Sequence, residues 1–325
     1  MARIKEKHPQ AQITFITFDA NRGFLERNNN LEHIIYFSLT TNLIYIFQQT
    51  VSIISRLRRA QFDVVINFEI YNYTAAVFTY LLRIPMRIGL NSMAEAAVYT
   101  HPVEYNVSGH ISSVFASLLK PLGIDVPYAY EPLCPDLKEV ERVSAWLHEK
   151  GMGCFVGIHP GTSCNFRGKQ YAQDRWVVLA RELMARHGVG VVLTGAPVDQ
   201  SYVEKIRRAI GQDERVLNAA GIFNMGELAV LMQKSRVYIS SDTGPAHLAA
   251  SMGVNVAVFY GPASPERYGP LNANSLVFYK REKCSPCVGG GYLNRKCPYH
   301  YRCLDYDPRF VAEKISKRFF NAQTN

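Results

Sequence analysis

The chain has 325 residues, of which 48% are hydrophobic and 19% charged, a composition typical of a soluble globular protein. This length predicts two domains of roughly 150 residues each. No apolar run reaches the roughly 18 residues of a membrane span, and residues 1–10 are charged and lack the apolar core of a signal peptide. The net charge of +9 favours anionic partners, but no nucleic-acid-binding motif accompanies it, so we expect no nucleic-acid partner.

The first part of the chain alternates apolar runs of strand length with helical patterns. Strands are predicted at 12–18, 33–37, 62–68 and 86–90, and helices at 42–60, 73–83 and 111–122. Such alternation is typical of a parallel, doubly wound α/β sheet.

The stretch 43–54 is apolar but is interrupted by three polar residues (48–50), which predicts a buried helix and not a membrane span. Arg56, Arg58 and Arg59 follow it and form the tightest basic cluster in this part of the chain. A solvated helix face is the simplest interpretation of that cluster.

A segment with three prolines and no clear periodicity, residues 125–135, predicts a linker. We therefore expect one domain at 1–135 and a second at 136–325. The second domain is predicted to contain helices at 139–150, 176–187, 203–210, 225–234 and 308–320, and strands at 155–160, 189–194, 215–218 and 275–279. The fold class expected is α/β, with two Rossmann-like domains built on parallel sheets.

Residues 237–270 predict a strand, a turn, a helix at 246–252, a strand at 256–260 and a Gly/Pro loop. Asp242 or Thr243 can cap the helix, and Pro245 fits its first turn. A helix that begins at the carboxyl end of a parallel strand directs unpaired N–H groups toward a ligand such as a diphosphate. An ordinary capped helix without a ligand is an equally good interpretation of the spacing alone.

The run DTGPAHLAA (242–250), followed by FYGP (259–262) and Pro265, resembles the donor-site signature of glycosyltransferase family 9. This family contains the heptosyltransferases of lipopolysaccharide inner-core synthesis and their relatives. The resemblance covers nearly the whole chain and is strongest over 155–270. It implies a GT-B-like fold, with two Rossmann-like domains that face a central cleft and a terminal helix that returns to the first domain.

The resemblance also implies a donor site in the second domain. Thr243, Gly244 and His247, beside Pro245, are expected to hold the diphosphate, with Asp242 orienting the loop or touching the sugar. The loop after the strand at 155–160 contributes the hydroxyl of Thr162, and Lys169 is expected to contact the phosphates. Gln170-Tyr171 stands where the family usually has Arg-Trp. Asp199 is expected to bind a ribose hydroxyl, to cap the helix near Gln200, or to do both.

The catalytic base is not identified. An inverting sugar transfer needs a carboxylate or His to take the acceptor proton, and in this family that residue is an Asp in a Gly-Asp turn after the first strand. We expect that first strand and its loop to be absent from this sequence. A misplaced start codon, a base from elsewhere in the chain, and an inactive protein are the alternatives. Asp19, Glu69 and His110 are weak substitute candidates, each with a structural role as the simpler interpretation.

The four cysteines of the Cys-rich loop 284–303, namely Cys284, Cys287, Cys297 and Cys303, follow the pattern C-x2-C-x9-C-x5-C. Four soft ligands within such a short segment suit a structural Zn²⁺ site, although the second pair is spaced too widely for a standard zinc ribbon. Two disulfides and free thiols remain alternatives. We expect no cofactor to be required for catalysis, because a helix terminus and a lysine can supply the positive charge of a metal ion.

These observations lead to one main hypothesis. The chain is predicted to be an inverting glycosyltransferase that moves a sugar, such as heptose, from a nucleotide-diphosphate-sugar to a lipopolysaccharide core or other surface-glycan acceptor. It is expected in the cytoplasm, at the inner face of the membrane, with an anionic lipid-linked or oligosaccharide acceptor. The alternative is a non-catalytic nucleotide-sugar-binding paralogue. A Rossmann-type dehydrogenase is disfavoured, since no G-x-G-x-x-G motif follows an early strand.

Overall fold

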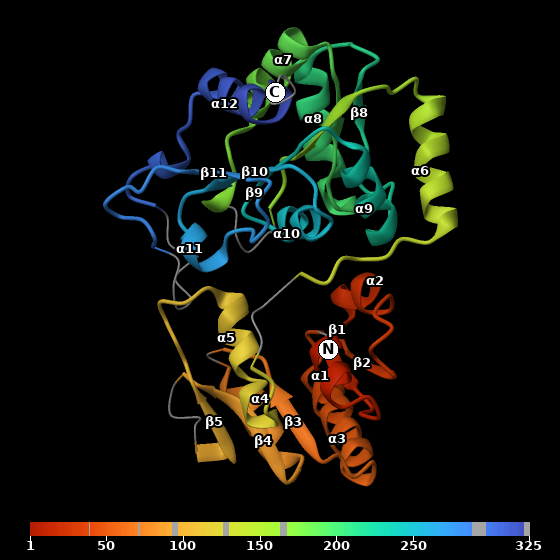
Figure 1. Cartoon of the computed structure of the whole chain (residues 1–325), viewed down its shortest axis with the longest axis vertical. Coiled ribbons are helices and arrows are strands. Elements are labelled where there is room, and N and C mark those ends of the chain that lie inside the picture. The colour runs from red at the N-terminus through yellow and green to blue at the C-terminus, as the bar shows by residue number, and fades with distance from the viewer. Residues whose placement is uncertain are drawn as a thin grey trace. The chain divides into compact units, whose positions relative to one another are not determined.

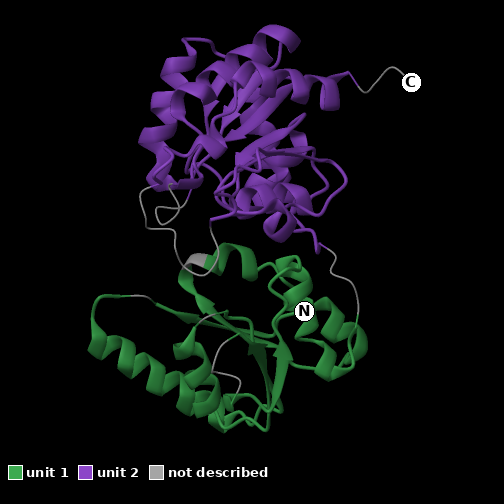
Figure 2. Ribbon diagram, turned by 90° about the vertical axis from the view of Figure 1, so that its left-hand side faces the viewer, with its two compact units in different colours: residues 1–129 green, residues 130–325 purple. Residues whose placement is uncertain are grey.

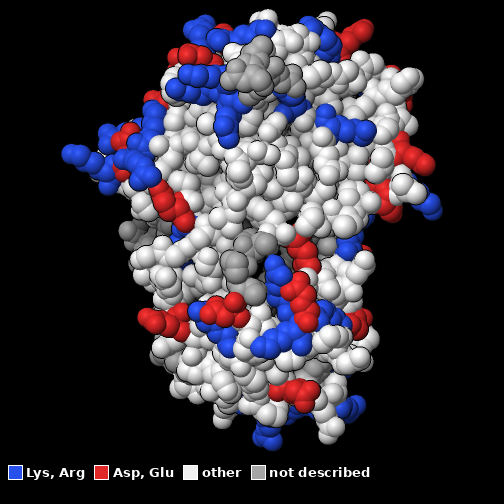
Figure 3. Space-filling model, viewed as in Figure 1, with Lys and Arg blue, Asp and Glu red and all other residues white. Residues whose placement is uncertain are grey.

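The computed structural model describes residues 1–38, 40–70, 72–92, 97–125, 130–162, 168–287 and 297–321 (Figure 1). The chain divides into two compact units, residues 1–129 and 130–325 (Figure 2). The division falls inside the predicted linker, ahead of the boundary that we expected after residue 135. On the face displayed in Figure 3, Lys and Arg side chains form several groups with Asp and Glu among them.

Unit 1 contains five helices and five short strands in its described part. The helices are α1 (Ala2–Lys7), α2 (Arg22–Leu25), α3 (Leu43–Arg59), α4 (Tyr73–Leu81) and α5 (Ile111–Ser117). The strands are β1 (Thr14–Phe18), β2 (His33–Phe37), β3 (Val64–Asn67), β4 (Met86–Asn91) and β5 (His101–Glu104). All of their pairings are parallel, and they form two separate sheets, β1-β2 and β3-β4-β5.

Helix α3 forms where the sequence predicts it, but the expectation that its apolar half is buried is wrong. Asn42 caps the helix by accepting the N–H groups of Ile44 and Tyr45 through its side chain. Ile53 and Leu57 are its buried residues. The apolar residues of the first turns extend around the helix beyond this core-facing stripe, so several of them contact solvent.

Unit 2 contains a six-stranded parallel sheet with the strand order β11-β10-β9-β6-β7-β8. Its strands are β6 (Phe155–His159), β7 (Gly190–Leu193), β8 (Val216–Asn218), β9 (Tyr238–Ser241), β10 (Val256–Tyr260) and β11 (Ser275–Tyr279). Its helices are α6 (Leu137–Glu149), α7 (Gln173–His187), α8 (Gln200–Ile210), α9 (Met225–Lys234), α10 (Gly244–Ser251), α11 (Pro265–Tyr268) and α12 (Pro308–Ile315). Counted from β6, this is the 3-2-1-4-5-6 order of dinucleotide-binding sheets.

The centre of the unit 2 sheet is buried on both faces. Every residue of β6, β7, β9 and β10 is buried, as expected for parallel strands covered by helices on both sides. The terminal helix α12 belongs to unit 2, where it packs against α7. One hydrogen bond of this contact joins His187 Nε2 and Ser316 Oγ at 2.6 Å.

Most predicted elements are found within a few residues of their expected ends, and three short elements were missed. The bounds of β2, α9, β10 and β11 match the prediction. Helices α2 and α11 have only four residues each, too few for a helical period to show in sequence. Strand β5 reads His-Pro-Val-Glu, in which proline and charge hide a strand that lies beside β4.

Candidate functional site

The candidate site lies where the strand order of the unit 2 sheet reverses. The chain runs from β6 to β7 on one side of β6, and later returns to place β9 on the other side. In β6, His159 pairs in register with Ser240 of β9, so the two strands end close together. Loops that leave such neighbouring strands diverge to opposite faces of the sheet and open a crevice at their carboxyl ends.

An ion pair links the two loops at this reversal point. Lys169 Nζ, in the segment after β6, donates to Asp242 Oδ2, directly after β9, at 2.6 Å. The side chains are only 15% and 7% exposed, so water screens the pair weakly. Loss of one partner would leave an unpaired charge in a buried place. The sequence proposed both residues for the site but did not predict that they contact each other.

The segment after β9 forms the start of α10 and is open to solvent at its first residue. Thr243 occupies the N-cap position without capping through its side chain. Its hydroxyl lies 3.0 Å from Ser240 Oγ and donates to the carbonyl of Ser241 at 3.3 Å. A methyl group added to Gly244 would meet no atom within 4 Å. The helix terminus therefore has open space beside its backbone, and Pro245 lies in its first turn.

The remaining residue predicted on α10 is His247, which is partly exposed in the second turn of the helix.

Asp242 also lies near Tyr260 of β10. Burial, reinforced by the carboxylate of Asp242, holds the pKa of Tyr260 above its usual range. The hydroxyl of Tyr260 donates to the carbonyl of Tyr268 at 2.6 Å.

The loop after β6 contributes a buried hydroxyl. Thr162 Oγ1 is buried and has no hydrogen-bond partner among the residues that the structure describes. A buried hydroxyl without a partner costs free energy, and a bound ligand oxygen would remove that cost. Gly161 precedes it, and a methyl group there would lie 3.3 Å from Asp199 Oδ2. The backbone of this loop therefore passes close to the carboxylate of Asp199.

Asp199 has a structural role, different from the helix cap that we expected. Its Oδ2 accepts the N–H of Ala196 at 3.0 Å and so closes the short turn Pro197–Asp199. It does not cap α8 through its side chain. The turn fixes the carboxylate beside Gly161 at the carboxyl end of β7.

His159, the last residue of β6, is a site feature that the sequence did not single out. Its Nδ1 lies 3.1 Å from Thr194 Oγ1, and the ring is buried. Burial lowers its pKa to about 4, against a smaller opposing effect of the Asp199 charge. The imidazole is therefore neutral at pH 7. Its position directly after a buried strand was the available sequence signal.

The three candidate bases lie in unit 1 beyond the carboxyl ends of β1, β3 and β5, and each already has a structural contact. Asp19 accepts hydrogen bonds from Ser38 and Arg22, which lower the pKa of its carboxyl group in that order of effect. Glu69 accepts a hydrogen bond from Asn72 Nδ2 at 3.5 Å. His110 caps α5, since its Nδ1 accepts the N–H of Ser112 at 3.2 Å.

The four C-terminal cysteines are not disulfide-bonded. Burial raises the pKa of the Cys303 thiol to about 11, and the charges of Cys284, Cys287 and Cys297 add to this effect, so the four lie in one neighbourhood. Among the described residues, however, no group of three or more His, Cys, Asp or Glu side chains is arranged to hold a metal ion. The thiols are thus near one another without forming a coordination sphere.

Comparison with known proteins identifies the family. The model of glycosyltransferase family 9 (heptosyltransferase) matches residues 50–297, most of the chain. The chain belongs to glycosyltransferase family 9. It is 22% identical over 97% of its length to lipooligosaccharide heptosyltransferase 2 of Haemophilus ducreyi and covers 92% of that protein. A 27% identical match to the Haemophilus influenzae protein of the same name spans 56% of the chain and about half, 51%, of that protein.

Solved structures show the same fold. A family 9 glycosyltransferase from Veillonella parvula has a TM-score of 0.78 at 19% identity, with 98% of this chain and 91% of that chain covered. The E. coli ADP-heptose lps heptosyltransferase II has a TM-score of 0.76 at 17% identity, with coverages of 99% and 94%. Together with the parallel sheets, these likenesses confirm the expected α/β, GT-B-like fold class.

The Lys169–Asp242 pair gives a testable energetic prediction. We expect Lys169→Met and Asp242→Asn each to lower the free energy of unfolding by about 3 kcal/mol, because each leaves a buried charge without its partner. The double variant should lose clearly less free energy of unfolding than the two single variants together, since it leaves neither charge behind. Urea unfolding of the four proteins measures this cycle. Strictly additive losses would show that the two side chains do not interact.

The buried His159 predicts a pH dependence. Its pKa is lowered from 6.5 to about 4 in the folded state, so the unfolded chain binds the proton more tightly. The stability that this group contributes is complete above pH 6.5 and is lost as the pH falls toward 4, by about 3 kcal/mol in total. In His159→Asn, the part of the pH dependence of the free energy of unfolding that comes from this imidazole should vanish. Equal slopes of wild type and variant between pH 6.5 and 4 would contradict the buried, neutral imidazole.

Proposed function

We propose that this chain is an inverting glycosyltransferase that moves a sugar, with heptose as the first candidate, from a nucleotide-diphosphate-sugar to a lipopolysaccharide core or other surface-glycan acceptor. The observation that carries the proposal is the site at the β6/β9 reversal, with an open helix terminus and a buried lysine, in a member of glycosyltransferase family 9. The similar folds of the E. coli ADP-heptose lps heptosyltransferase II and of the E. coli heptosyltransferase WaaC with ADP support a nucleotide-diphosphate donor.

The donor diphosphate would bind at the first turn of α10. The backbone beside Gly244 is open, and the helix terminus carries roughly half a positive charge. Lys169 supplies a full charge, which Asp242 holds in place in the absence of ligand. The hydroxyls of Thr162 and Thr243 lie on the two loops that border the crevice.

The chemistry follows from this arrangement of charge. When the sugar–phosphate bond breaks, the second phosphate group of the leaving diphosphate gains negative charge. Donors fixed in advance at that position lower the barrier, because they need no reorganisation during the reaction. The helix terminus, Lys169 and His247 would together supply what a divalent cation supplies elsewhere, and we propose catalysis without a required cofactor.

The acceptor base is the less determined part of the proposal. An acceptor hydroxyl must lose its proton as the new bond forms. Asp19, Glu69 and His110 are the candidates, and the hydrogen bonds that lower the pKa of Asp19 make it a weaker base. If none of them serves, the chain is a nucleotide-sugar-binding paralogue without transfer activity, which is our second candidate function.

The acceptor is proposed to be anionic, either lipid-linked or an oligosaccharide, and the protein to work in the cytoplasm at the inner face of the membrane. The described helices include none that is long and apolar enough to cross a bilayer. A net charge of +9 supports an encounter with a phosphorylated acceptor, which would bring the protein to the membrane surface.

Calorimetric titration with ADP, UDP and GDP tests the donor site. We expect one nucleoside diphosphate to bind, and His247→Ala to weaken that binding by about 1–3 kcal/mol through the loss of a charge-assisted hydrogen bond. His148→Ala, on α6, is the matched control and should bind as wild type does. Absence of binding by all three nucleotides would reject both candidate functions. Binding with no sugar transfer to a core-oligosaccharide acceptor would favour the paralogue.

We further propose that Cys284, Cys287, Cys297 and Cys303, whose thiols are free, move together to hold a structural zinc ion. The purified protein should then contain one equivalent of zinc by elemental analysis, and Cys284→Ser/Cys287→Ser should lose it. Cys134→Ser/Cys154→Ser, which lies outside the quartet, is the control and should retain zinc. Four titratable thiols in a metal-free native protein would reject this site.

A further inference from the structure

Helix α3 presents its most apolar side chains to solvent. Ile44, Phe47 and Val51 are 70%, 69% and 49% exposed, and Leu43 at the start of the helix is 78% exposed. The spacing of 44, 47 and 51 places these three side chains on one face of the helix. Single exposed apolar residues are ordinary, but a run of them along one helix face marks a surface that binds something.

This exposed face is distinct from the face by which α3 is anchored in unit 1. Ile53 and Leu57 are buried and pack in a cluster with residues of β2 and α4. The helix is therefore apolar on two sides, and only one of them is needed to hold it in the fold. The other side has no structural role in the described part of unit 1.

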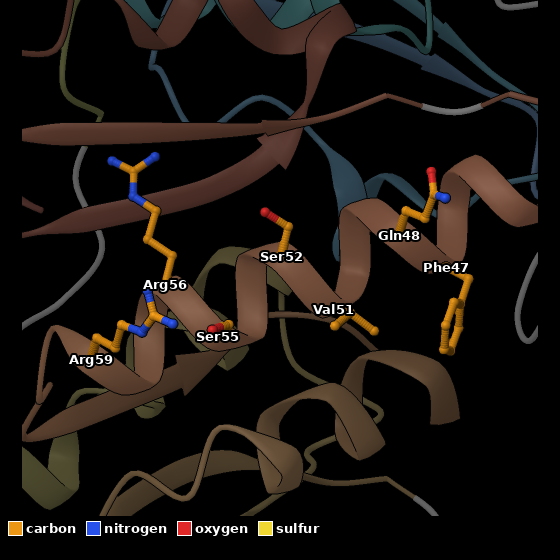
Figure 4. Close-up of a pocket in the computed structure, with 7 residues that line it drawn as sticks. All are labelled: Phe47, Gln48, Val51, Ser52, Ser55, Arg56 and Arg59. Atoms are coloured by element: carbon orange, nitrogen blue, oxygen red, sulfur yellow. The ribbon is translucent and has the colours of Figure 1, made fainter.

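The exposed face changes from apolar to cationic along the helix. Figure 4 shows two rows of side chains on α3, each of which ends in an arginine. One row consists of Phe47, Val51, Ser55 and Arg59, and the other of Gln48, Ser52 and Arg56. Together these seven residues line one shallow hollow on the helix surface.

Within the described ranges, no carboxylate pairs with the arginines of this face. The segment 43–59 contains no Asp or Glu. Arg56 and Arg59 make no ion pair with any residue that the structure describes. Arg58 instead donates from Nε to the carbonyl of Leu81 at 2.8 Å, which ties α3 to the end of α4. The positive charge of the hollow is thus available to an external anion.

Helix α4 also carries apolar side chains that are exposed. Tyr73, Val77 and Tyr80 are 52%, 52% and 56% exposed, and their spacing also places them on one helix face. The two helices share a core cluster, and the Arg58–Leu81 hydrogen bond joins their carboxyl-terminal ends. Tyrosines are well suited to an interface between water and an apolar layer, because the ring is apolar and the hydroxyl is polar.

Charge distinguishes between the possible occupants. A second copy of this chain that paired α3 with α3 would offer no carboxylate from the helix, so the arginines would gain no anionic partner. A bilayer that contains anionic phospholipids offers an apolar interior for Phe47 and Val51 and a phosphate layer for Arg56 and Arg59. This is the pattern of an interfacial helix.

We propose that the α3 face, defined by Leu43, Ile44, Phe47, Val51, Arg56 and Arg59, docks unit 1 onto membranes rich in anionic phospholipid. The inference rests on the proposed function, since a lipid-linked acceptor would be presented at such a surface. The proposed membrane contact belongs to unit 1 and does not involve the donor site proposed in unit 2.

Vesicle co-sedimentation tests the surface. The full chain is mixed with phosphatidylcholine vesicles that contain or lack phosphatidylglycerol. We expect strong binding only to the anionic vesicles, weakened by salt. Arg56→Ala/Arg59→Ala should reduce partitioning roughly 25-fold, because each arginine near an anionic surface contributes about fivefold. Phe47→Ser/Val51→Ser should reduce it about tenfold or more.

Matched variants separate this surface from general charge and hydrophobicity. Arg208→Ala/Arg215→Ala removes two exposed arginines of unit 2, and Val107→Ser/Leu137→Ser removes two exposed apolar side chains elsewhere. Both should bind anionic vesicles nearly as wild type does. Equal losses in the control and α3 variants, or equal binding to neutral and anionic vesicles, would overturn the proposal.

Two further readouts keep the outcomes distinguishable. The α3 variants should retain nucleoside diphosphate binding, which shows that they fold and that the donor site is intact. If nucleotide binding fails in wild type while vesicle binding depends on α3, the proposed function fails and the docking surface stands. Light scattering that reveals a dimer dissociated by Phe47→Ser/Val51→Ser would assign the face to self-association and overturn the membrane proposal.

Discussion

The buried contact between Lys169 and Asp242 connects the two loops that border the crevice at the centre of the unit 2 sheet. Because β6 and β9 are neighbours in the sheet but distant in sequence, nothing in the local chain holds their following loops together. An ion pair of low exposure does so. A diphosphate bound there, as we propose, would meet a lysine whose position is already fixed, and it would compete with the attraction of a carboxylate.

The sequence was sufficient to predict the elements around the candidate site of unit 2 but not the contacts between its residues. The DTGPAHLAA run predicted a strand, turn and helix, since β-branched residues, a Gly-Pro turn and a helical pattern follow in order, and β9, α10 and β10 are where it placed them. The contacts of Asp242 with Lys169 and of Asp199 with Ala196 were not predictable in the same way. They depend on strand order and on loop conformation, and neither has a sequence period. His159 was overlooked because its one sequence signal, a place at the end of an apolar strand, does not reveal that the ring itself is buried.

In unit 1 the prediction was wrong for a different reason, because the hydrophobicity of residues 43–54 was taken as a sign that they are buried. A sequence reveals that residues 43–54 are apolar, but it does not reveal how wide a stripe the core can accept. In the structure the sheet of unit 1 is divided between β1-β2 and β3-β4-β5, and its buried clusters are small. Such a core covers one face of α3 only. The remaining apolar side chains of the helix therefore stay at the surface, where they are available to an external partner.

The distribution of tryptophan in this chain has a practical consequence. The only two tryptophans of the sequence, Trp146 and Trp176, both belong to unit 2. Trp176 is fully buried, edge-on to Tyr171 and Phe259, while Trp146 is partly buried against Phe223. Tyr171 lies two residues beyond Lys169, so the indole of Trp176 is an intrinsic fluorophore close to the Lys169 loop. Tryptophan emission therefore reports on unit 2. A local change at α3, in unit 1, would need a fluorescent label introduced on that helix.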